Sequence, residues 1–320
     1  MTKHKVGLIG LGIMGRRMLE HMGRHARFDP VLLWDPSQAA CAMAAGTAPG
    51  ARVAGSAGEV IDGADVVYLA CPPVPRKAYA LMVAETGKAV FLEKPLGVDV
   101  AESRDLVARL TTAGVPAAVN FTQAAGQALA TVNGASNAMG APKGVDIVVT
   151  YAKWPRDWQV EADWLRFSAE GGATREVISH FLFFSARVLG PLRLAHAQVT
   201  YPSDGELCET HLTARLENAE GVPVTVMLSV GGAQPDRQEM TIKGETQSFR
   251  VSDFHLLSAS HGGLFAEIAP PPADPRAVSL KAQLDGLDRC IAGLDHPLAT
   301  PSEALAVQEL IEAMLSAESR

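Results

Sequence analysis

A lysine between a glutamate and a proline, in Glu93-Lys94-Pro95, is the most informative feature of this 320-residue sequence. The tripeptide follows the apolar run 89–92, which predicts a buried strand. In an open parallel sheet, ligands bind at the edge that the carboxyl ends of the strands form. A lysine at that edge can donate a hydrogen bond to a substrate oxygen and stabilise the negative charge that develops there. The alternative interpretation is a solvated lysine in a strand-to-helix loop.

A glycine-rich turn near the amino end predicts where a coenzyme binds. The residues Gly10-Leu11-Gly12-Ile13-Met14-Gly15 have the spacing G-x-G-x-x-G, follow the apolar run 6–9 and open a helical stretch. The glycines permit a tight turn, and the backbone through Ile13 and Met14 can approach a pyrophosphate at the amino end of the helix. Asp35 lies 20 residues after Gly15, where its carboxylate can accept both ribose hydroxyls. This context favours dinucleotide binding over a tight turn with a solvated aspartate.

Asp35 also bears on which dinucleotide binds. A carboxylate repels a 2′-phosphate, and Pro36, Ser37 and Gln38 supply no cation to hold one. The sequence therefore predicts NAD. Arg16 and Arg17 are the cations that keep NADP open as the less favoured alternative.

One further tripeptide and two further residues fall at the same predicted edge of the sheet. Cys71-Pro72-Pro73 ends a strand and offers a backbone turn against which a coenzyme can lie, and ordinary loop punctuation is the alternative. Asn120 and Gln123 follow the last predicted strand of this half. Their position alone predicts that Asn120 contacts the coenzyme and Gln123 the substrate.

The first 120 residues alternate short apolar runs with amphipathic stretches. Near-continuous apolar strands separated by helices predict a parallel sheet that is covered on both faces. The strands are expected near 6–9, 31–34, 65–70, 89–92 and 116–119, and the helices near 13–23, 37–46, 75–86 and 101–113.

The second half contains successive strands that are joined by short turns, which predicts a mostly antiparallel sheet. These strands are expected near 145–151, 192–201, 207–217, 222–230, 237–243 and 246–251, and helices near 124–138, 171–189, 276–293 and 301–317. The last helix opens with Thr300-Pro301-Ser302-Glu303, the signature of a capping box. We expect an α/β protein with a dinucleotide-binding domain at 1–122 and an α+β domain for substrate binding and dimerisation at 123–320, with the C-terminal helix packing back on the first domain.

The composition narrows the possible partners and compartment. Hydrophobic residues make up 48% and charged residues 20%, which is ordinary for a globular protein, and the net charge of −7 argues against nucleic acid or an anionic membrane as partner. The cysteines lie far apart, without metal-ligand spacing, so no metal site is predicted. Free thiols and the lack of a signal peptide or a long apolar segment predict a cytoplasmic protein.

The glycine turn, Asp35, Cys71-Pro72-Pro73 and residues 87–96 around Lys94 together resemble the Gfo/Idh/MocA oxidoreductases, named after glucose–fructose oxidoreductase and inositol dehydrogenase. Residues 171–180 resemble the family segment G-G-x-x-x-D-x-G-x-H, and residues 303–313 resemble its terminal helix. The resemblance implies a doubly wound Rossmann domain and an α/β domain with a large open sheet that is often used for dimerisation, hence a homodimer or homotetramer. It also implies NAD(P)-dependent hydride transfer, commonly on sugars, cyclitols or their derivatives.

The resemblance assigns catalytic roles to Lys94 and His180, but the sequence departs from the family pattern nearby. Glu176 replaces an aspartate, Ile178 replaces a glycine, and Phe183 stands where a further acid is usual. These changes predict a less polar pocket, which weighs against a sugar. The family's Thr-Pro-x-x-x-His pattern is also altered, with Cys71 first and Arg76 or Lys77 in place of the histidine.

Glu176 and His180 are four residues apart in a predicted helix, so both side chains project from one face. A carboxylate beside an imidazole can orient it for proton transfer while a hydride leaves carbon for the nicotinamide. Glu176 as an ion-pair partner of Arg175, and His180 as a satisfied core histidine, are the structural alternatives.

Trp154, Arg156 and Trp158 follow the first strand of the second half and can line a substrate pocket. An aromatic cluster that closes a domain interface explains the same residues.

Other functions remain open at this point. The glycine turn followed by Met18 also resembles 3-hydroxyisobutyrate-type dehydrogenases, but those have an all-helical second domain. The altered histidine pattern leaves room for a non-catalytic NAD(H)-binding sensor, and the apolar pocket leaves room for an imine or enone reductase.

Overall fold

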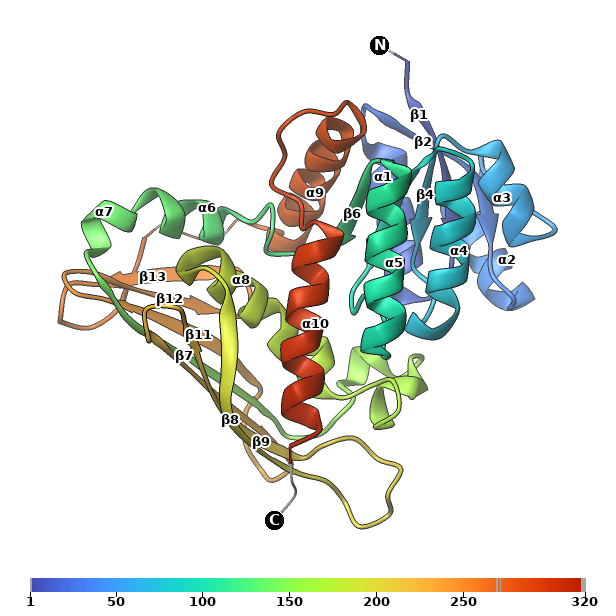
Figure 1. Cartoon of the computed structure of the whole chain (residues 1–320). Helices are drawn as coiled ribbons and strands as arrows, with labels where there is room; N and C mark the ends of the chain where they lie inside the picture. The colour runs from blue at the N-terminus through green and yellow to red at the C-terminus, as the bar shows by residue number, and fades with distance from the viewer. Residues whose placement is uncertain (1, 269, 271, 318–320) are drawn as a thin grey trace. The chain divides into compact units, whose positions relative to one another are not determined.

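The computed structural model describes residues 2–268, 270 and 272–317. The chain divides into two compact units, each built on its own sheet (Figure 1). Unit 1 comprises the chain up to Phe121 together with Leu280–Leu305. Unit 2 comprises Thr122–Ser279 and the chain from Ala306 onward.

Unit 1 contains a six-stranded sheet in which every pairing is parallel, in the order β3-β2-β1-β4-β5-β6. The order reverses at β1, and in such sheets the point of reversal is where ligands bind. The strands are β1 (His4–Ile9), β2 (Phe28–Trp34), β3 (Arg52–Val53), β4 (Val66–Leu69), β5 (Ala89–Glu93) and β6 (Ala117–Asn120). All residues of β4 and β5 are buried, as expected for strands covered on both faces.

The helices of unit 1 connect these strands. They are α1 (Ile13–Arg24), α2 (Gln38–Thr47), α3 (Ala57–Gly63), α4 (Pro73–Glu85) and α5 (Val100–Ala113). Local sequence defines α5 well: the Asp99 carboxylate accepts the Glu102 N–H at the amino end, and Gly114 adopts φ 64° at the carboxyl end. Figure 1 shows α4 and α5 side by side, and these two helices pack against each other.

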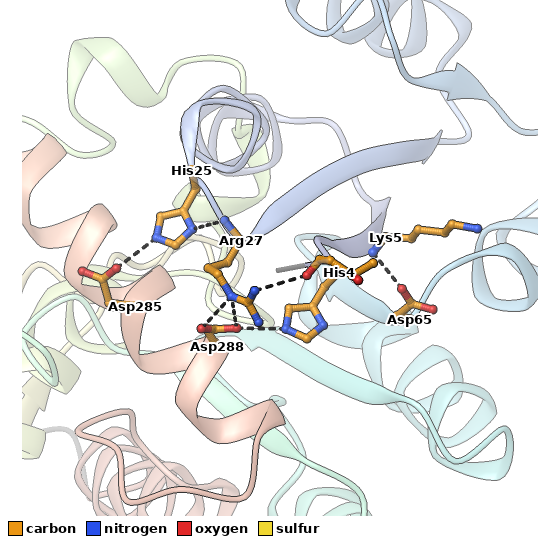
Figure 2. A network of polar contacts seen from close by, with 8 residues as sticks. His4, Lys5, His25, Arg27, Asp65, Asp285 and Asp288 are labelled. Carbon is orange, nitrogen blue, oxygen red and sulfur yellow. Dashed lines mark hydrogen bonds and ion pairs between the residues drawn. The ribbon is translucent and has the colours of Figure 1, made fainter.

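Unit 1 is completed by the carboxyl part of α9 (Pro275–Ile291), which comes from the other end of the sequence. Asp285 and Asp288 of α9 lie against the start of β1 and the turn before β2, as Figure 2 shows. The Asp288 carboxylate accepts the Arg27 Nε–H at 2.9 Å and lies 2.9 Å from His4 Nε2. These contacts join the two separate segments of unit 1.

Unit 2 contains an eight-stranded sheet in the order β14-β13-β12-β11-β7-β10-β9-β8. Among the described strands of this sheet, only β7 and β10 pair in parallel, which confirms the predicted mostly antiparallel sheet. The strands are β7 (Pro142–Tyr151), β8 (Leu192–Thr200), β9 (His211–Asn218), β10 (Pro223–Val230), β11 (Arg237–Gly244), β12 (Ser248–Ser252), β13 (Leu256–Ser260) and β14 (Ala266–Glu267).

One face of this sheet is buried. In β10, Val224, Val226 and Leu228 are buried while Thr225 and Met227 are exposed, the alternation of a half-covered strand. Figure 1 shows α8 (Ser179–Leu189) beside the sheet, where it contacts β7. The remaining helices are α6 (Gln127–Gly134), α7 (Ser136–Met139), two short 3₁₀ helices (Asp157–Gln159 and Asp163–Arg166), a π-helical turn (Thr174–Ile178) and α10 (Pro301–Leu315).

The start of α10 confirms the predicted capping box. The Glu303 N–H donates to the Thr300 hydroxyl at 3.2 Å, and the Thr300 N–H donates to the Glu303 carboxylate at 2.8 Å. Within the part of the chain that the structure describes, no helix combines the length and the apolar character needed to cross a bilayer.

Candidate active site

The carboxyl ends of the strands of unit 1 gather most of the residues that the sequence singles out. Gly10 follows β1, Asp35 follows β2, Cys71 follows β4, and Lys94 follows β5. Asn120 is the last residue of β6 and pairs in register with Glu93. Because the sheet is parallel, all of these residues lie at one edge.

The glycine turn has the geometry that a close-lying ligand requires. Gly10 has φ 95°, and a Cβ there would lie 2.3 Å from the Cys71 nitrogen. A Cβ on Gly15 would lie 2.0 Å from the Gly10 oxygen, so the helix can approach the strand only with glycine at that position. At Gly12, by contrast, no described atom lies within 4 Å of the Cβ position. The turn is therefore packed on the sheet side and open at the start of α1.

The amino end of α1 is suited to an anion. Gly12 is the N-cap and provides no side chain to satisfy the first N–H groups, and residues 13–16 contain no acid. Unsatisfied N–H groups at a helix start carry partial positive charge and bind phosphate. Ile13 and Met14, the first residues of α1, are half-buried at this position.

Asp35 is tied to the glycine turn. Its Oδ2 accepts the Leu11 N–H at 2.7 Å and its Oδ1 accepts the Ser37 N–H at 2.8 Å. Each carboxylate oxygen has two lone pairs, so each can accept one further hydrogen bond. The carboxylate is thus held in a fixed orientation beside the turn.

A buried polar network lies at the base of Lys94. The Glu93 carboxylate accepts hydrogen bonds from the Tyr68 hydroxyl and, at 2.7 Å, from the Asn120 side-chain nitrogen. Burial raises the pKa of the Glu93 carboxyl and raises that of Tyr68 well above its ordinary value. The Glu93 side chain therefore points into unit 1, while the adjacent Lys94 is half-buried at the strand end.

The turn at Cys71-Pro72-Pro73 starts α4. Pro72 is the N-cap and is exposed, whereas Cys71 is buried, and burial raises the pKa of its thiol. Arg76, one of the two residues that the resemblance puts in place of the histidine, is buried and donates to the main-chain oxygen of Cys71 at 2.5 Å. Sequence reasoning noted Arg76 only as a departure and did not assign it a role.

In unit 2, Arg156 lies among aromatic rings. Its guanidinium carbon is 4.7 Å from the ring centroid of Trp158, 5.4 Å from that of Tyr151 and 5.6 Å from that of Trp154. Such distances are typical of cation–π contacts. The Trp154 indole N–H donates to the Leu165 oxygen at 2.9 Å, and Trp158 is exposed. The aromatic cluster therefore has one exposed ring, that of Trp158, and a largely buried cation, Arg156.

Glu176 lies on the same side of unit 2 as Arg156. Its Oε1 accepts a hydrogen bond from the Gln159 side chain at 3.1 Å and is 3.9 Å from Arg156 Nη2. Arg175 instead forms a two-point ion pair with Glu312 of α10, at 2.7 Å for each bond. The structure thus settles one alternative: the ion-pair partner of Arg175 is Glu312.

His180 is buried in the first turn of α8, directly after the π-helical turn. Its imidazole meets the ring of Phe254 edge to face, with centroids 5.6 Å apart, and Phe254 stacks on Phe181 at 5.3 Å. Asp253 and Phe254 have φ of 49° and 65°, values that are uncommon outside glycine and often mark functional sites.

The structure also shows two residues that sequence reasoning missed. Glu209 is buried, its carboxylate accepts the Thr174 N–H at 2.7 Å, and burial raises its pKa. Phe254 contacts His180 from a turn that is distant in the sequence. Neither belongs to a motif, so no pattern in the sequence indicates them.

Asn120 and Gln123 share an unusual property. The Asn120 side-chain oxygen and both polar atoms of the Gln123 side chain are buried and have no hydrogen-bond partner among the described residues. Such atoms are costly unless another group pairs with them. Each is therefore a candidate contact for a bound molecule.

Comparisons with known proteins fit this geometry. Residues 4–121 match the sequence model of the oxidoreductase family with an NAD-binding Rossmann fold, Gfo/Idh/MocA. An uncharacterized oxidoreductase of Streptococcus pneumoniae serotype 4 is 32% identical over 105 residues, and an inositol 2-dehydrogenase of Cereibacter sphaeroides is 33% identical over 106 residues. Both alignments cover 32% of this chain, and they span only 28% and 31% of the relatives' own lengths.

Among solved structures, the UDP-N-acetylglucosamine 3-dehydrogenase from Acidithiobacillus ferrooxidans superposes with a TM-score of 0.82. The identity is 17%, and the superposition covers 99% of this chain and 98% of the other. At that identity the likeness shows a shared fold. It confirms the predicted fold class, a parallel Rossmann sheet followed by a mostly antiparallel open sheet.

Proposed function

We propose that the chain, whose residues 4–121 match the Gfo/Idh/MocA oxidoreductases, is an enzyme that transfers a hydride between a nicotinamide coenzyme and a CH–OH or C=O group of a small molecule. The observation that carries the proposal is the shared sheet edge of unit 1. There the open glycine turn and Lys94 follow β1 and β5 in one parallel sheet. This arrangement supports a coenzyme and a catalytic cation at one site.

The coenzyme proposed is NAD. The open amino end of α1 supports binding of the pyrophosphate through Gly12, Ile13 and Met14, and the fixed Asp35 carboxylate supports ribose binding. A carboxylate in that place opposes a 2′-phosphate, so NADP is the less favoured coenzyme. Pro72 and Pro73 supply a backbone wall beside the turn, and the unpaired Asn120 oxygen supports a contact to the coenzyme.

The proton chemistry proposed uses Lys94 and His180. The nicotinamide supplies the hydride chemistry when it is bound. Lys94 donates a hydrogen bond to the substrate oxygen and stabilises its developing charge. His180 accepts the hydroxyl proton at its imidazole in the oxidative direction and returns it in the reductive direction. Glu176 assists as an anion whose position is set by Gln159 and Arg156.

The substrate proposed is a sugar, a cyclitol or a related, less polar alcohol or ketone. The ring of Phe254 against His180, and the buried Ile178 and Phe183, support the less polar class. Gln123, with its unpaired buried amide, and the cluster of Trp154, Arg156 and Trp158 are the proposed substrate contacts. We further propose that the chain forms a homodimer or homotetramer through the sheet of unit 2. The proposed location is the cytoplasm.

The test begins with NADH binding, measured by fluorescence, and continues with turnover over a panel of polyols, alcohols, ketones, imines and enones. Lys94→Met and His180→Ala are expected to lower turnover by about 100-fold or more, as loss of general acid–base or charge stabilisation does. NADH binding is expected to survive both substitutions. Full activity in either variant would remove that residue from the mechanism.

The chain offers matched controls. Lys88 lies at the opposite end of β5, where its ammonium donates to the Asp62 oxygen at 2.7 Å, and His211 is exposed on β9. Lys88→Met and His211→Ala are expected to keep wild-type turnover. NADH binding without turnover over the whole panel would favour a sensor, and turnover of imines or enones alone would favour the reductase.

A further inference from the structure

Arg76 of α4 is a buried cation whose guanidinium donates to three main-chain oxygens. It is 2% exposed, and its Nη1 donates to the Glu93 oxygen at 2.7 Å and to the Pro95 oxygen. Its Nη2 donates to the Cys71 oxygen at 2.5 Å. Within residues 2–268, 270 and 272–317, no carboxylate forms an ion pair with Arg76.

The oxygens that accept hydrogen bonds from Arg76 lie at the ends of two neighbouring strands. Two of them, the oxygens of Glu93 and Pro95, belong to the residues directly before and after Lys94. The third belongs to Cys71, at the end of the neighbouring strand β4. One guanidinium therefore fixes the backbone on both sides of Lys94 and ties it to the adjacent strand end.

The planar guanidinium is suited to this task. Its five N–H groups leave in fixed directions, so one side chain can bond to several carbonyls at once, whereas an ammonium acts as a point charge. Burying a cation against neutral carbonyls is costly compared with burying an apolar side chain. The observed contacts are those of a group that holds a strand end in place.

We propose that Arg76 is a positioning residue that fixes Lys94 toward the bound coenzyme by holding the carbonyls on both sides of it. The inference rests on the proposed function, because it assumes that Lys94 lies beside the coenzyme. It adds a residue that stands outside the glycine turn and outside the proposed proton chemistry. Arg76 acts through Lys94 and does not itself touch substrate or coenzyme.

The test measures the reactivity of Lys94 without needing a substrate. Wild-type protein, with and without saturating NADH, is pulsed with acetic anhydride, and acetylation of each lysine is followed by mass spectrometry. Lys153 and Lys281, whose side chains are 65% and 67% exposed, serve as internal references. At NADH concentrations near 100 times Kd almost every molecule is occupied, so acetylation of Lys94 is expected to slow about tenfold.

In Arg76→Met this protection is expected to fall below about twofold, because a displacement of about 1 Å is enough to misplace a catalytic group. The NADH Kd is expected to stay within about threefold of wild type, since the glycine turn and Asp35 are unchanged. Wild-type protection in folded Arg76→Met would overturn the inference. Arg27→Met is the matched control, because Arg27 also bonds a main-chain oxygen in unit 1, and it should keep full protection.

If Arg76→Met binds no NADH, Arg76→Lys gives the decisive comparison. A lysine keeps the charge but lacks the fork, so protection is expected to lie between wild type and none. Wild-type protection in Arg76→Lys would then overturn the inference. A lack of NADH protection at Lys94 in the wild type would instead contradict the proposed function, and the inference would fall with it.

Discussion

Asp35 illustrates how one side chain serves two purposes. It accepts the Leu11 N–H and the Ser37 N–H, and so it shapes the glycine turn before any ligand arrives. Its remaining lone pairs can accept hydrogen bonds from the ribose hydroxyls of the proposed coenzyme. A substitution at Asp35 should therefore change both the strength and the selectivity of coenzyme binding.

Asp35→Ser is expected to weaken NADH binding about tenfold, because a hydroxyl replaces a charged acceptor that is worth about 1.5–3 kcal/mol. The affinity for NADPH should change less or improve, because the carboxylate that repels a 2′-phosphate is gone. Titration of both coenzymes by fluorescence measures the ratio. Asp29→Ser, on the exposed side of β2, is the control. An unchanged NADH-to-NADPH ratio would show that Asp35 is not the discriminator.

The residues that sequence patterns indicated and those they missed differ in how they act. Lys94 and the glycine turn are predictable because strand ends and glycine spacing are local features of the sequence. Arg76 and Glu209 bond main-chain atoms that are 17 and 35 residues away, so their roles depend on the folded chain. A buried arginine that serves carbonyls has no sequence signature of its own.

At the scale of elements, α9 is held to unit 1 by charged contacts on its carboxyl half (Figure 2). Asp288 accepts from Arg27 and pairs with His4, while Asp285 pairs with His25 at 3.0 Å. His25 Nδ1 accepts the Arg27 N–H, so Nε2 carries the hydrogen that is donated to Asp285. Burial acts to raise the pKa of Asp288, but the hydrogen bonds from His4 and Arg27 outweigh it and leave the pKa below its ordinary value.

The lowered pKa of Asp288 decides how the stability of the fold depends on pH. A carboxylate with a lowered folded-state pKa stabilises the fold fully above its unfolded pKa, near 4, and loses that contribution as the pH falls through the folded value. Asp288→Asn is therefore expected to lower the free energy of unfolding by about 1 kcal/mol at pH 7, and the difference from wild type should narrow below about pH 4.

Urea unfolding of wild type and Asp288→Asn at pH 7, 5, 4 and 3 measures this difference. Asp29→Asn, on the exposed side of β2, is the control and should track wild type at every pH. A difference that is constant down to pH 3 would contradict the assigned role of the Asp288 charge.

Element prediction succeeded where a clear run of apolar residues marks the strand and failed for elements without such a run. The strands β1, β2, β4, β5 and β6 were each predicted to within a few residues. The short β3, β13 and β14 and the seven-residue α3 were missed. Ser56 and Glu59 cap α3, since the Ser56 hydroxyl accepts the Glu59 N–H at 3.2 Å, and this S-x-x-E pattern was the available signal. The π-helical turn before His180 has no comparable signal, because its wider hydrogen-bonding depends on packing.

For the whole molecule, the uncovered face of the sheet in unit 2 supports the proposed self-association. Met227, at the middle of β10, is 39% exposed and lies on the same face of the strand as the exposed Thr225. An apolar side chain in the centre of an open sheet face is a candidate for burial against a second copy.

Met227→Glu is expected to convert the proposed dimer or tetramer to a smaller species, because association would bury an unpaired charge. Sedimentation velocity at micromolar concentration measures the mass. Met43→Glu introduces the same charge at an exposed methionine of α2 in unit 1 and should leave the mass unchanged. A wild-type protein that sediments as a monomer would contradict the proposed assembly.

The discontinuity of unit 1 has a consequence for how the chain is made. Leu280–Leu305 belongs to the coenzyme-binding unit, yet it leaves the ribosome only after all of Thr122–Ser279. A nascent chain that stops before α9 carries the glycine turn and Lys94 but lacks the carboxylates that pair with His25 and Arg27. Translation order therefore postpones completion of the coenzyme-binding unit until the sheet of the other unit has been synthesised.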